Sequence, residues 1–223
     1  RIALDVPEKM RNYLTKNMNK WVDMPEAGYM DMQKWNEAEL EEDDFAEFAK
    51  EGKVYLGFDL SMTTDLTSIG LVARKGNDYR VKQLSFMPSD KYHERISKDK
   101  VRFDIFRDRG ELILTEGSTV DYTLVKAYIL KFCKEYDVQE VCYDKWNALQ
   151  LVHELEQEGL LMVEIEQSVR MLTDATKKFR ECVYNLTLKH YQDKLLKWSI
   201  GNARLFVDAS ENIKITKKKS IDR

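Results

Sequence analysis

The stretch VYLGFDLSMTTDLTSIGLV, residues 54–72, places an acidic residue directly after an apolar strand pattern. Its first part, VYLGF, is typical of a buried β-strand, and Asp59 follows where another apolar residue would add stability. A buried carboxylate without a partner costs several kcal/mol. Asp59 is therefore expected to be paired, hydrated or bound to a metal ion.

Composition indicates a folded protein without a strong overall charge. The 223 residues are 43% hydrophobic, enough for an ordinary core in one domain or in one domain with an appendage. The net charge of -3 gives no general attraction to nucleic acid, so a polyanion would need a local basic patch or metal ions. Three cysteines without CxxC spacing favour core thiols in a reducing compartment. Neither a signal peptide nor a membrane span is predicted, and we expect a soluble intracellular protein.

Apolar periodicity predicts a mixed sheet. Three β-rich segments at 54–60, 67–74 and 78–87, joined by short polar links, favour an antiparallel meander. Further along, strands are predicted at 138–144 and 161–167, alternating with helices that carry apolar stripes. The stripe of the last helix is Leu172, Ala175, Phe179, Cys182, Val183 and Leu186. A meander followed by β-α-β units predicts an α/β fold with helices on both faces of the sheet.

Asp59 and Asp144 both follow apolar strand patterns. If the two strands are parallel neighbours, the acids meet at one sheet edge, since adjacent strands lie roughly 4.8 Å apart. Two carboxylates that close together favour a hard divalent cation, Mg²⁺ or Mn²⁺, and two such ions can hydrolyse a phosphodiester. The alternative is structural: Asp59 caps a turn and Asp144 caps the helix that begins at KWNALQ.

The residues around both acids resemble the nuclease motifs of the large terminase subunit of tailed bacteriophages. GFDLSMTTDLTS (57–68) is similar to the first motif, G-x-D-L-S-x-x-x-D-L-T, and YDKWNA (143–148) to the second. RNYLTKNMNKWV (11–22) resembles the connector that leaves the ATPase domain of that family. WSIGNARLFVDASENIK (198–214), with Asn202 and Asp208, resembles the stretch before the third motif. The resemblance covers nearly the whole chain.

The resemblance implies a ribonuclease-H-like endonuclease with Asp59 and Asp144 as catalytic metal ligands for two Mg²⁺ or Mn²⁺ ions. It implies that residues 1–50 are a connector from an ATPase motor domain absent from this chain, and that residues 51–223 are the nuclease domain. The substrate would be concatemeric double-stranded DNA in the cytoplasm of the infected bacterial host. Terminase small subunit and portal would be partners of the intact protein.

Two positions depart from the family pattern or stay open. The third acid of the family opens a helix just beyond a Lys-rich stretch like KITKKKSIDR, so Asp222 falls short of it and the chain is expected to stop before that acid. Asp65 matches the first motif, but it could bind metal, cap a segment or orient a neighbour. No phosphate-binding P-loop motif occurs in the sequence. KKFR (177–180) and the lysines at 214 and 217–219 are the candidate phosphate contacts.

Two other functions remain open at this point. An ATPase of the actin and sugar-kinase type also begins its sheet with an acid at the end of the first strand, but its Gly-rich phosphate hairpin has no counterpart in DLSMTTDLTS. A catalytically silent module that docks DNA or packaging partners would use both acids only as caps. Metal-dependent cutting of DNA separates the nuclease from this module.

Overall fold

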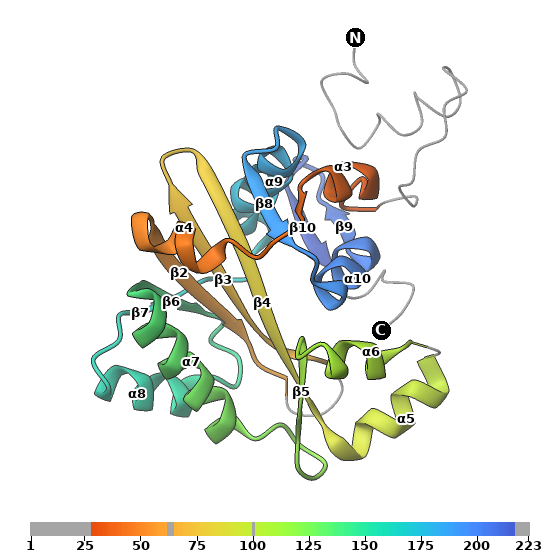
Figure 1. Cartoon of the computed structure of the whole chain (residues 1–223), viewed down its shortest axis with the longest axis vertical. Helices are drawn as coiled ribbons and strands as arrows, with labels where there is room; N and C mark the ends of the chain where they lie inside the picture. Colours follow the sequence, from red (N-terminus) through yellow and green to blue (C-terminus); the bar gives the residue numbers. More distant parts are fainter. Residues whose placement is uncertain (1–27, 62–64, 100, 217–223) are drawn as a thin grey trace.

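The computed structural model describes residues 28–61, 65–99 and 101–216, which fold around one large mixed sheet (Figure 1). Eight strands form the sheet in the order β1-β8-β4-β3-β2-β6-β7, with β5 paired to β4. Their bounds are β1 Glu39–Leu40, β2 Lys53–Asp59, β3 Thr67–Lys75, β4 Asp78–Pro88, β5 Leu112–Thr115, β6 Val138–Tyr143, β7 Met162–Glu164 and β8 Leu188–Tyr191.

The meander predicted from the sequence is confirmed. β2 pairs antiparallel with β3, and β3 pairs antiparallel with β4. The hairpin between β3 and β4 closes through Gly76, whose φ of 61° is left-handed and suits a residue without a Cβ. Asp59, Ser68 and Ser85 are register partners across the three strands, so the end of β2 lies in line with the start of β3.

The β-α-β part is also confirmed. β6 lies parallel beside β2, and β7 lies parallel beside β6. The helix before β6 is α7 (Tyr122–Tyr136), and α8 (Leu149–Gln157) connects β6 to β7. β7 is shorter than predicted, three residues against seven, because the chain after Glu164 leaves the sheet.

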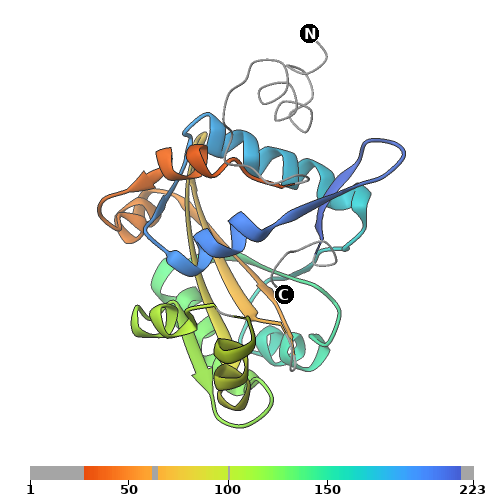
Figure 2. The same ribbon diagram turned by 90° about the vertical axis from the view of Figure 1, so that its right-hand side faces the viewer.

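Helices cover both faces of the sheet, as predicted (Figure 1). On one face, alternate residues of β2 (Val54, Leu56 and Phe58) pack with α7, α8 and α4 (Phe45–Glu51). On the other side, α9 (Val169–Tyr184) and α3 (Met32–Glu37) enclose a second core around Trp35, which is fully buried. Figure 2 shows α9 and α3 on the same side of the strands, with α10 (Lys194–Asn202) nearby.

β4 has two separate neighbours on its outer edge. β8 pairs with residues 79–81 of β4, and β5 pairs with residues 85–88. A third core lies beside the β5 end and contains α5 (Ser89–Asp99) and α6 (Phe103–Asp108). Residues 82–84 lie between the two pairings, and no backbone pair joins them to either neighbour in the described part of the chain.

The N-terminal described residues are less solvated than the sequence suggests. The acidic run at 36–53 is predicted as a solvated helical face without chemistry, yet α4 within it buries Phe45 and Ala49. Tyr29, Met30 and Trp35 pack into the core around α9. The predicted domain boundary at residue 50 stays a prediction, while residues 28–51 pack on the sheet in this structure.

The predicted stripe of α9 is partly wrong. Ala175 is exposed, and Leu186 lies beyond the end of the helix in a left-handed conformation. The buried positions instead include Thr173 and Arg180, so polar residues hold part of this interface. The hairpin of β9 (Arg204–Val207) and β10 (Ile213–Thr216) packs on α9 through Ile213, and Thr173 Oγ1 accepts a hydrogen bond from the N–H of Ile213 at 3.0 Å.

A bilayer-crossing helix, with the length and apolarity that this needs, does not occur among the described residues.

Candidate metal centre

Asp59 and Asp144 lie at the same edge of the sheet. β2 and β6 are parallel neighbours, and Phe58 is the register partner of Tyr143. Each acid directly follows one member of this pair along the chain: Asp59 is the last residue of β2, and Asp144 comes just after the end of β6. Parallel neighbouring strands are roughly 4.8 Å apart, and register partners point to the same face. The register therefore brings the backbone of residues 59 and 144 to the same edge of the sheet, the condition that the sequence analysis set for the two acids to meet.

Neither acid is buried in the core. Asp59 is exposed and Asp144 is half-buried. Alternation along β2 explains this, because Phe58 points into the core with α7 and Asp59 points away from it. The apolar pattern before Asp59 thus does not extend to its side chain, and the burial cost considered from the sequence is avoided.

The capping alternative for Asp144 is not what the structure shows. α8 begins at Leu149, and its N-cap position is Ala148. Asp144 Oδ1 instead accepts a hydrogen bond from the N–H of Trp146 at 3.2 Å, which closes a tight turn directly after β6. This hydrogen bond orients the carboxylate of Asp144, and it gives one carboxylate oxygen a structural role in the turn.

The other residues of the first motif fix the turn after β2. The hydroxyl of Thr67, which is fully buried, accepts the N–H of Ser61 and donates to the carbonyl of Ser61, both at 2.9 Å. The N–H of Asp65 donates to Ser61 Oγ at 3.1 Å. Ser61 and Thr67 therefore clamp the ends of the segment that joins β2 to β3. The role of the Asp65 carboxylate stays open.

Tyr122 contributes a buried hydroxyl close to this edge. Its oxygen is inaccessible to solvent and has no hydrogen-bond partner among the described residues. Burial raises the pKa of Tyr122, and the negative charge of Asp59 raises it further. The phenol thus lies within electrostatic reach of the carboxylate. A buried polar group without a partner is costly, and native structures rarely keep one.

A glycine pair leaves the sheet face beside Asp59 open. Gly57 and Gly70 are cross-strand partners, two residues from Asp59 and Ser68. A Cβ added at Gly57 would meet its nearest neighbour at 3.8 Å, and one at Gly70 at 4.0 Å. These positions are therefore not filled by packing. Glycines within strands often mark a place where a ligand approaches the backbone closely, and this face leaves room for one.

The donor set fits a hard divalent cation in part. Carboxylate oxygens are the ligands that Mg²⁺ and Mn²⁺ prefer, and Mg²⁺ commonly takes one or two carboxylates and completes its shell with water and substrate phosphate. Across residues 28–61, 65–99 and 101–216, no group of three or more His, Cys, Asp or Glu side chains could hold a metal ion. Asp222, which falls short of the position of the third acid in the family pattern, lies outside the described residues.

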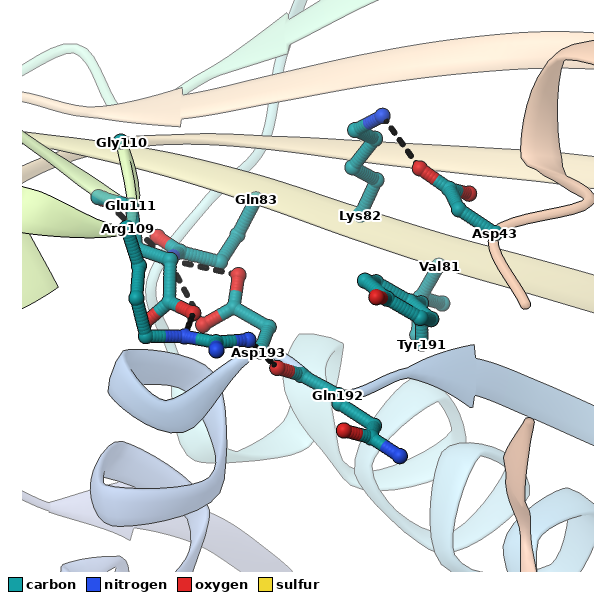
Figure 3. Close-up of a pocket in the computed structure, with 10 residues that line it drawn as sticks. All are labelled: Asp43, Val81, Lys82, Gln83, Arg109, Gly110, Glu111, Tyr191, Gln192 and Asp193. Carbon is teal, nitrogen blue, oxygen red and sulfur yellow. Dashed lines mark hydrogen bonds and ion pairs between the residues drawn. The ribbon is translucent and has the colours of Figure 1, made fainter. Parts of the chain in front are cut away.

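A second carboxylate cluster, formed by Asp193 and Glu111, lies at the outer edge of β4, and the sequence did not predict it. The two acids line a pocket of about 220 Å³ together with Lys82 and Arg109 (Figure 3). Gln83 Nε2 donates to both oxygens of Asp193, at 3.2 and 2.9 Å, and Arg109 Nε donates to Glu111 Oε1 at 2.5 Å. Asp193 and Glu111 also accept backbone N–H groups at the start of α10. Burial is the main reason that the pKa of Asp193 rises to about 6.

This second cluster is a structural joint between β4, β5 and α10. The residues come from positions 83, 109–111 and 193, so no local motif marks them in the sequence. Each charged group in it is paired within the cluster. It lies on β4, two strands away from β2, and does not contribute to the edge that holds Asp59.

The predicted basic contacts are only partly available. Arg180 is 6% exposed and lies 5.9 Å from the ring centroid of Tyr29, so the prediction that it meets phosphate is wrong. Lys177 is exposed, and Lys214 Nζ donates to the carbonyl of Gln167 at 2.9 Å. The lysines at 217–219 lie outside the described residues.

Asn202, Asp208 and His190 lie on parts of the chain other than β2 and β6, the strands that lead to Asp59 and Asp144. Asp208 accepts hydrogen bonds from the N–H groups of Ser210 and Asn212 in the turn between β9 and β10, and Asn212 holds its pKa below the usual range. Asn202 ends α10. His190 is buried and stacks on Trp35, with ring centroids 3.9 Å apart. The three cysteines are free thiols.

Comparison with known proteins identifies the family of the chain. The family profile described as "Terminase large subunit, endonuclease domain" matches residues 1–223. The chain belongs to this terminase endonuclease family. The large terminase subunit of Enterobacteria phage HK97 is 28% identical over 175 residues, which cover 77% of this chain and 34% of that protein.

Solved terminase structures share the fold. The crystal structure of the HK97 bacteriophage large terminase aligns with 99% of this chain and 46% of that one, with a TM-score of 0.78 and 24% identity. The large terminase nuclease from thermophilic phage G20c aligns over 78% of this chain and 75% of that one, with a TM-score of 0.52 and 11% identity. The chain thus has the ribonuclease-H-like fold of terminase nucleases, and it spans less than half the length of the HK97 protein.

Proposed function

We propose that this chain is a divalent-metal-dependent endonuclease domain that cuts double-stranded DNA, with Asp59 and Asp144 as its metal ligands. The observation that supports the proposal is the parallel register of β2 and β6, whose last pair, Phe58 and Tyr143, directly precedes the two motif acids. Membership of the terminase endonuclease family supports the same activity. The family also favours a nuclease over the kinase-type ATPase that the sequence left open.

The residues of the chain divide the work in the following way. Asp59 would bridge or anchor the ions, and Asp144 would anchor one of them while its Oδ1 also holds the turn to Trp146. The clamp of Ser61 and Thr67 keeps the end of β2 fixed, so the carboxylate of Asp59 needs little reorganisation on binding. Two bound Mg²⁺ or Mn²⁺ ions would supply an activated water and stabilise the leaving oxygen of the phosphodiester.

The open face beside Asp59 supports a large substrate. The Gly57 and Gly70 pair carries no side chain that would keep a phosphodiester backbone away from the sheet. The net charge of -3 agrees with a domain that holds DNA through bound ions rather than through its overall charge. Such binding is expected to be weak and to fall steeply with salt.

The whole protein would act in DNA packaging. By analogy with the terminase relatives, it would cut concatemeric phage DNA in the cytoplasm of an infected bacterium. An ATPase domain, a small terminase subunit and a portal would be its partners there. A third ligand would come from Asp222, from substrate phosphate or from water.

Cleavage of supercoiled plasmid in Mn²⁺ tests the proposal. The parent chain is expected to nick and linearise the plasmid, and EDTA is expected to stop it. Asp59→Asn and Asp144→Asn keep the side-chain shape, and Asn at 144 can still accept the N–H of Trp146. Each should reduce cutting by at least about 100-fold, the scale reached when a principal catalytic group is removed.

A structural control separates catalysis from folding. Asp208→Asn changes a carboxylate that serves only the turn between β9 and β10 and should cut at the parent rate. Equal cutting by Asp59→Asn and the parent would overturn the site assignment. A parent chain that binds DNA but never cuts it, at any Mn²⁺ concentration, would favour the docking module.

A further inference from the structure

Trp146 and Leu149 form an exposed apolar pair beside the candidate metal centre. The side chain of Trp146 is 78% exposed, more than any other large apolar residue in the described part of the chain, and Leu149 is 64% exposed. Single exposed apolar residues are common on protein surfaces, so what sets these two apart is their position next to the acids. Both residues closely follow Asp144 in the chain, at the edge of the sheet where β2 ends with Asp59.

The position of Trp146 is fixed by its backbone. Its N–H donates to Asp144 Oδ1 at 3.2 Å, and the N–H of Ala148 donates to the carbonyl of Lys145 at 3.4 Å. Asn147 between them has a left-handed φ of 61°, which Asn tolerates better than most residues. Ala148 is fully buried in the core under α8. The turn is therefore anchored at both ends, and it holds the indole outward without a flexible loop.

We infer that Trp146, with Leu149 beside it, contacts the double-stranded DNA that reaches the Asp59 and Asp144 edge, the indole packing against a base or sugar in a groove. The inference rests on the proposed function. Duplex DNA is favoured as the occupant because Trp146 is tied to Asp144 itself, so a phosphodiester near that carboxylate also lies near the indole. Proteins that grip DNA by shape insert apolar wedges of this kind into the minor groove.

Two further features suit a DNA contact. Lys145 lies between the acid and the indole with 65% of its side chain exposed, and its Nζ is 3.6 Å from Glu164, a loose surface pair that a phosphate could replace. An apolar wedge in the minor groove responds to the shape of the duplex and makes no hydrogen bonds to base edges, so the contact tolerates different sequences. An endonuclease without sequence preference needs a contact of this type next to its metal centre.

Fluorescence anisotropy with a short labelled duplex of random sequence tests the inference. The titration is made in Ca²⁺, a hard cation that carboxylates also bind, so that ion-held contact with DNA is kept, and gel electrophoresis checks that the duplex stays intact. Trp146→Ala is expected to weaken binding by about ten-fold, which corresponds to about 1.4 kcal/mol. Trp146→Phe, which keeps an aromatic ring, should retain most of the affinity. Leu161→Ala is the matched control, because Leu161 is 60% exposed but lies at the opposite end of the β6 and β7 pair.

Salt dependence distinguishes the role of Trp146 from that of its charged neighbour. An apolar contact releases no counterion, so Trp146→Ala should lower the affinity equally at every salt concentration. Lys145→Ala should instead reduce the slope of log K against log salt. Intrinsic fluorescence gives a second readout: DNA should change the tryptophan emission of the parent, and most of this change should be lost in Trp146→Phe.

The outcomes separate the inference from the proposed function. If the parent binds and cuts DNA and Trp146→Ala does both equally well, the inference is overturned and the nuclease assignment stands. If the parent neither binds nor cuts duplex DNA, both are overturned. If Trp146→Ala binds DNA normally but loses affinity for another protein, the surface serves a protein partner and the DNA contact is wrong. Normal circular dichroism together with the ten-fold loss of affinity in Trp146→Ala supports the DNA contact, because the loss then does not come from unfolding.

Discussion

Replacing Tyr122 by Phe should stabilise the metal-free chain. The hydroxyl of Tyr122 is buried and has no partner among the described residues, while its ring packs on the core formed by α4, α7 and α8. A buried polar group without a hydrogen bond costs about 1–3 kcal/mol, and the ring of Phe fills the same space. We therefore expect the free energy of unfolding to rise by about 1 kcal/mol.

Thermal and urea unfolding in EDTA measure this change. For a chain of this size, 1 kcal/mol corresponds to a shift of about 2–4 °C in Tm. Tyr191→Phe, at a tyrosine that is 38% exposed, is the control and should stay within about 0.5 kcal/mol of the parent. Mn²⁺ should stabilise the parent more than the Phe variant if the hydroxyl is satisfied by water around a bound ion.

The reasoning fails if Tyr122→Phe destabilises the metal-free chain by about 1 kcal/mol or more. The hydroxyl would then make a hydrogen bond in solution, and it would not report on an incomplete site. An equal gain from Mn²⁺ in both proteins would separate Tyr122 from the metal centre, even if the metal-free stability rises as expected.

Two other substitutions test the scaffold. The pKa of Asp193 is raised from 3.8 to about 6, so the folded chain binds this proton more tightly than the unfolded chain. The resulting contribution to stability is present at acidic pH and is lost as the pH rises through 6. Asp193→Asn should remove up to about 3 kcal/mol of this pH dependence between pH 4 and 7, measured by urea unfolding. A Cβ at Gly52 would lie 2.7 Å from the carbonyl oxygen of Arg74, so Gly52→Ala should cost about 1–3 kcal/mol, whereas Gly57→Ala, with its nearest neighbour at 3.8 Å, should unfold close to the parent. An unchanged pH profile in Asp193→Asn, or equal stability of the two Ala variants, would contradict these expectations.

The central strands could be predicted because their patterns are local and consistent. β2, β3 and β4 alternate or run apolar between clear turn signals, and each lies within a few residues of its predicted bounds. The parallel pairing of β2 with β6 entered the sequence analysis only as a condition for the two acids to meet, and the structure fulfils that condition. The connection from β2 to β6 runs through three other strands, so no local rule fixes this pairing.

The periphery could not be predicted because long-range packing decides it. β8 is a four-residue strand that exists through its parallel pairing with β1 and β4. Arg180 reads as a surface cation in KKFR, but α9 turns it toward Tyr29. Asp193 and Glu111 are 82 residues apart in the sequence, and the packing of α10 beside β4 brings them together. The residues next to each of these positions in the sequence carry no pattern that would predict such long-range contacts.

The divided outer edge of β4 has a consequence for how the molecule loosens. β8 and β5 are attached to the same strand through separate short pairings, and each belongs to a different core. Attachments of this kind open as independent cooperative units. Amide protons of β8 and β5 would then exchange with solvent deuterium as two groups, both ahead of those of β2 and β3. β5 and β8 can therefore open locally and independently while β2 and β6, which lead to Asp59 and Asp144, stay paired.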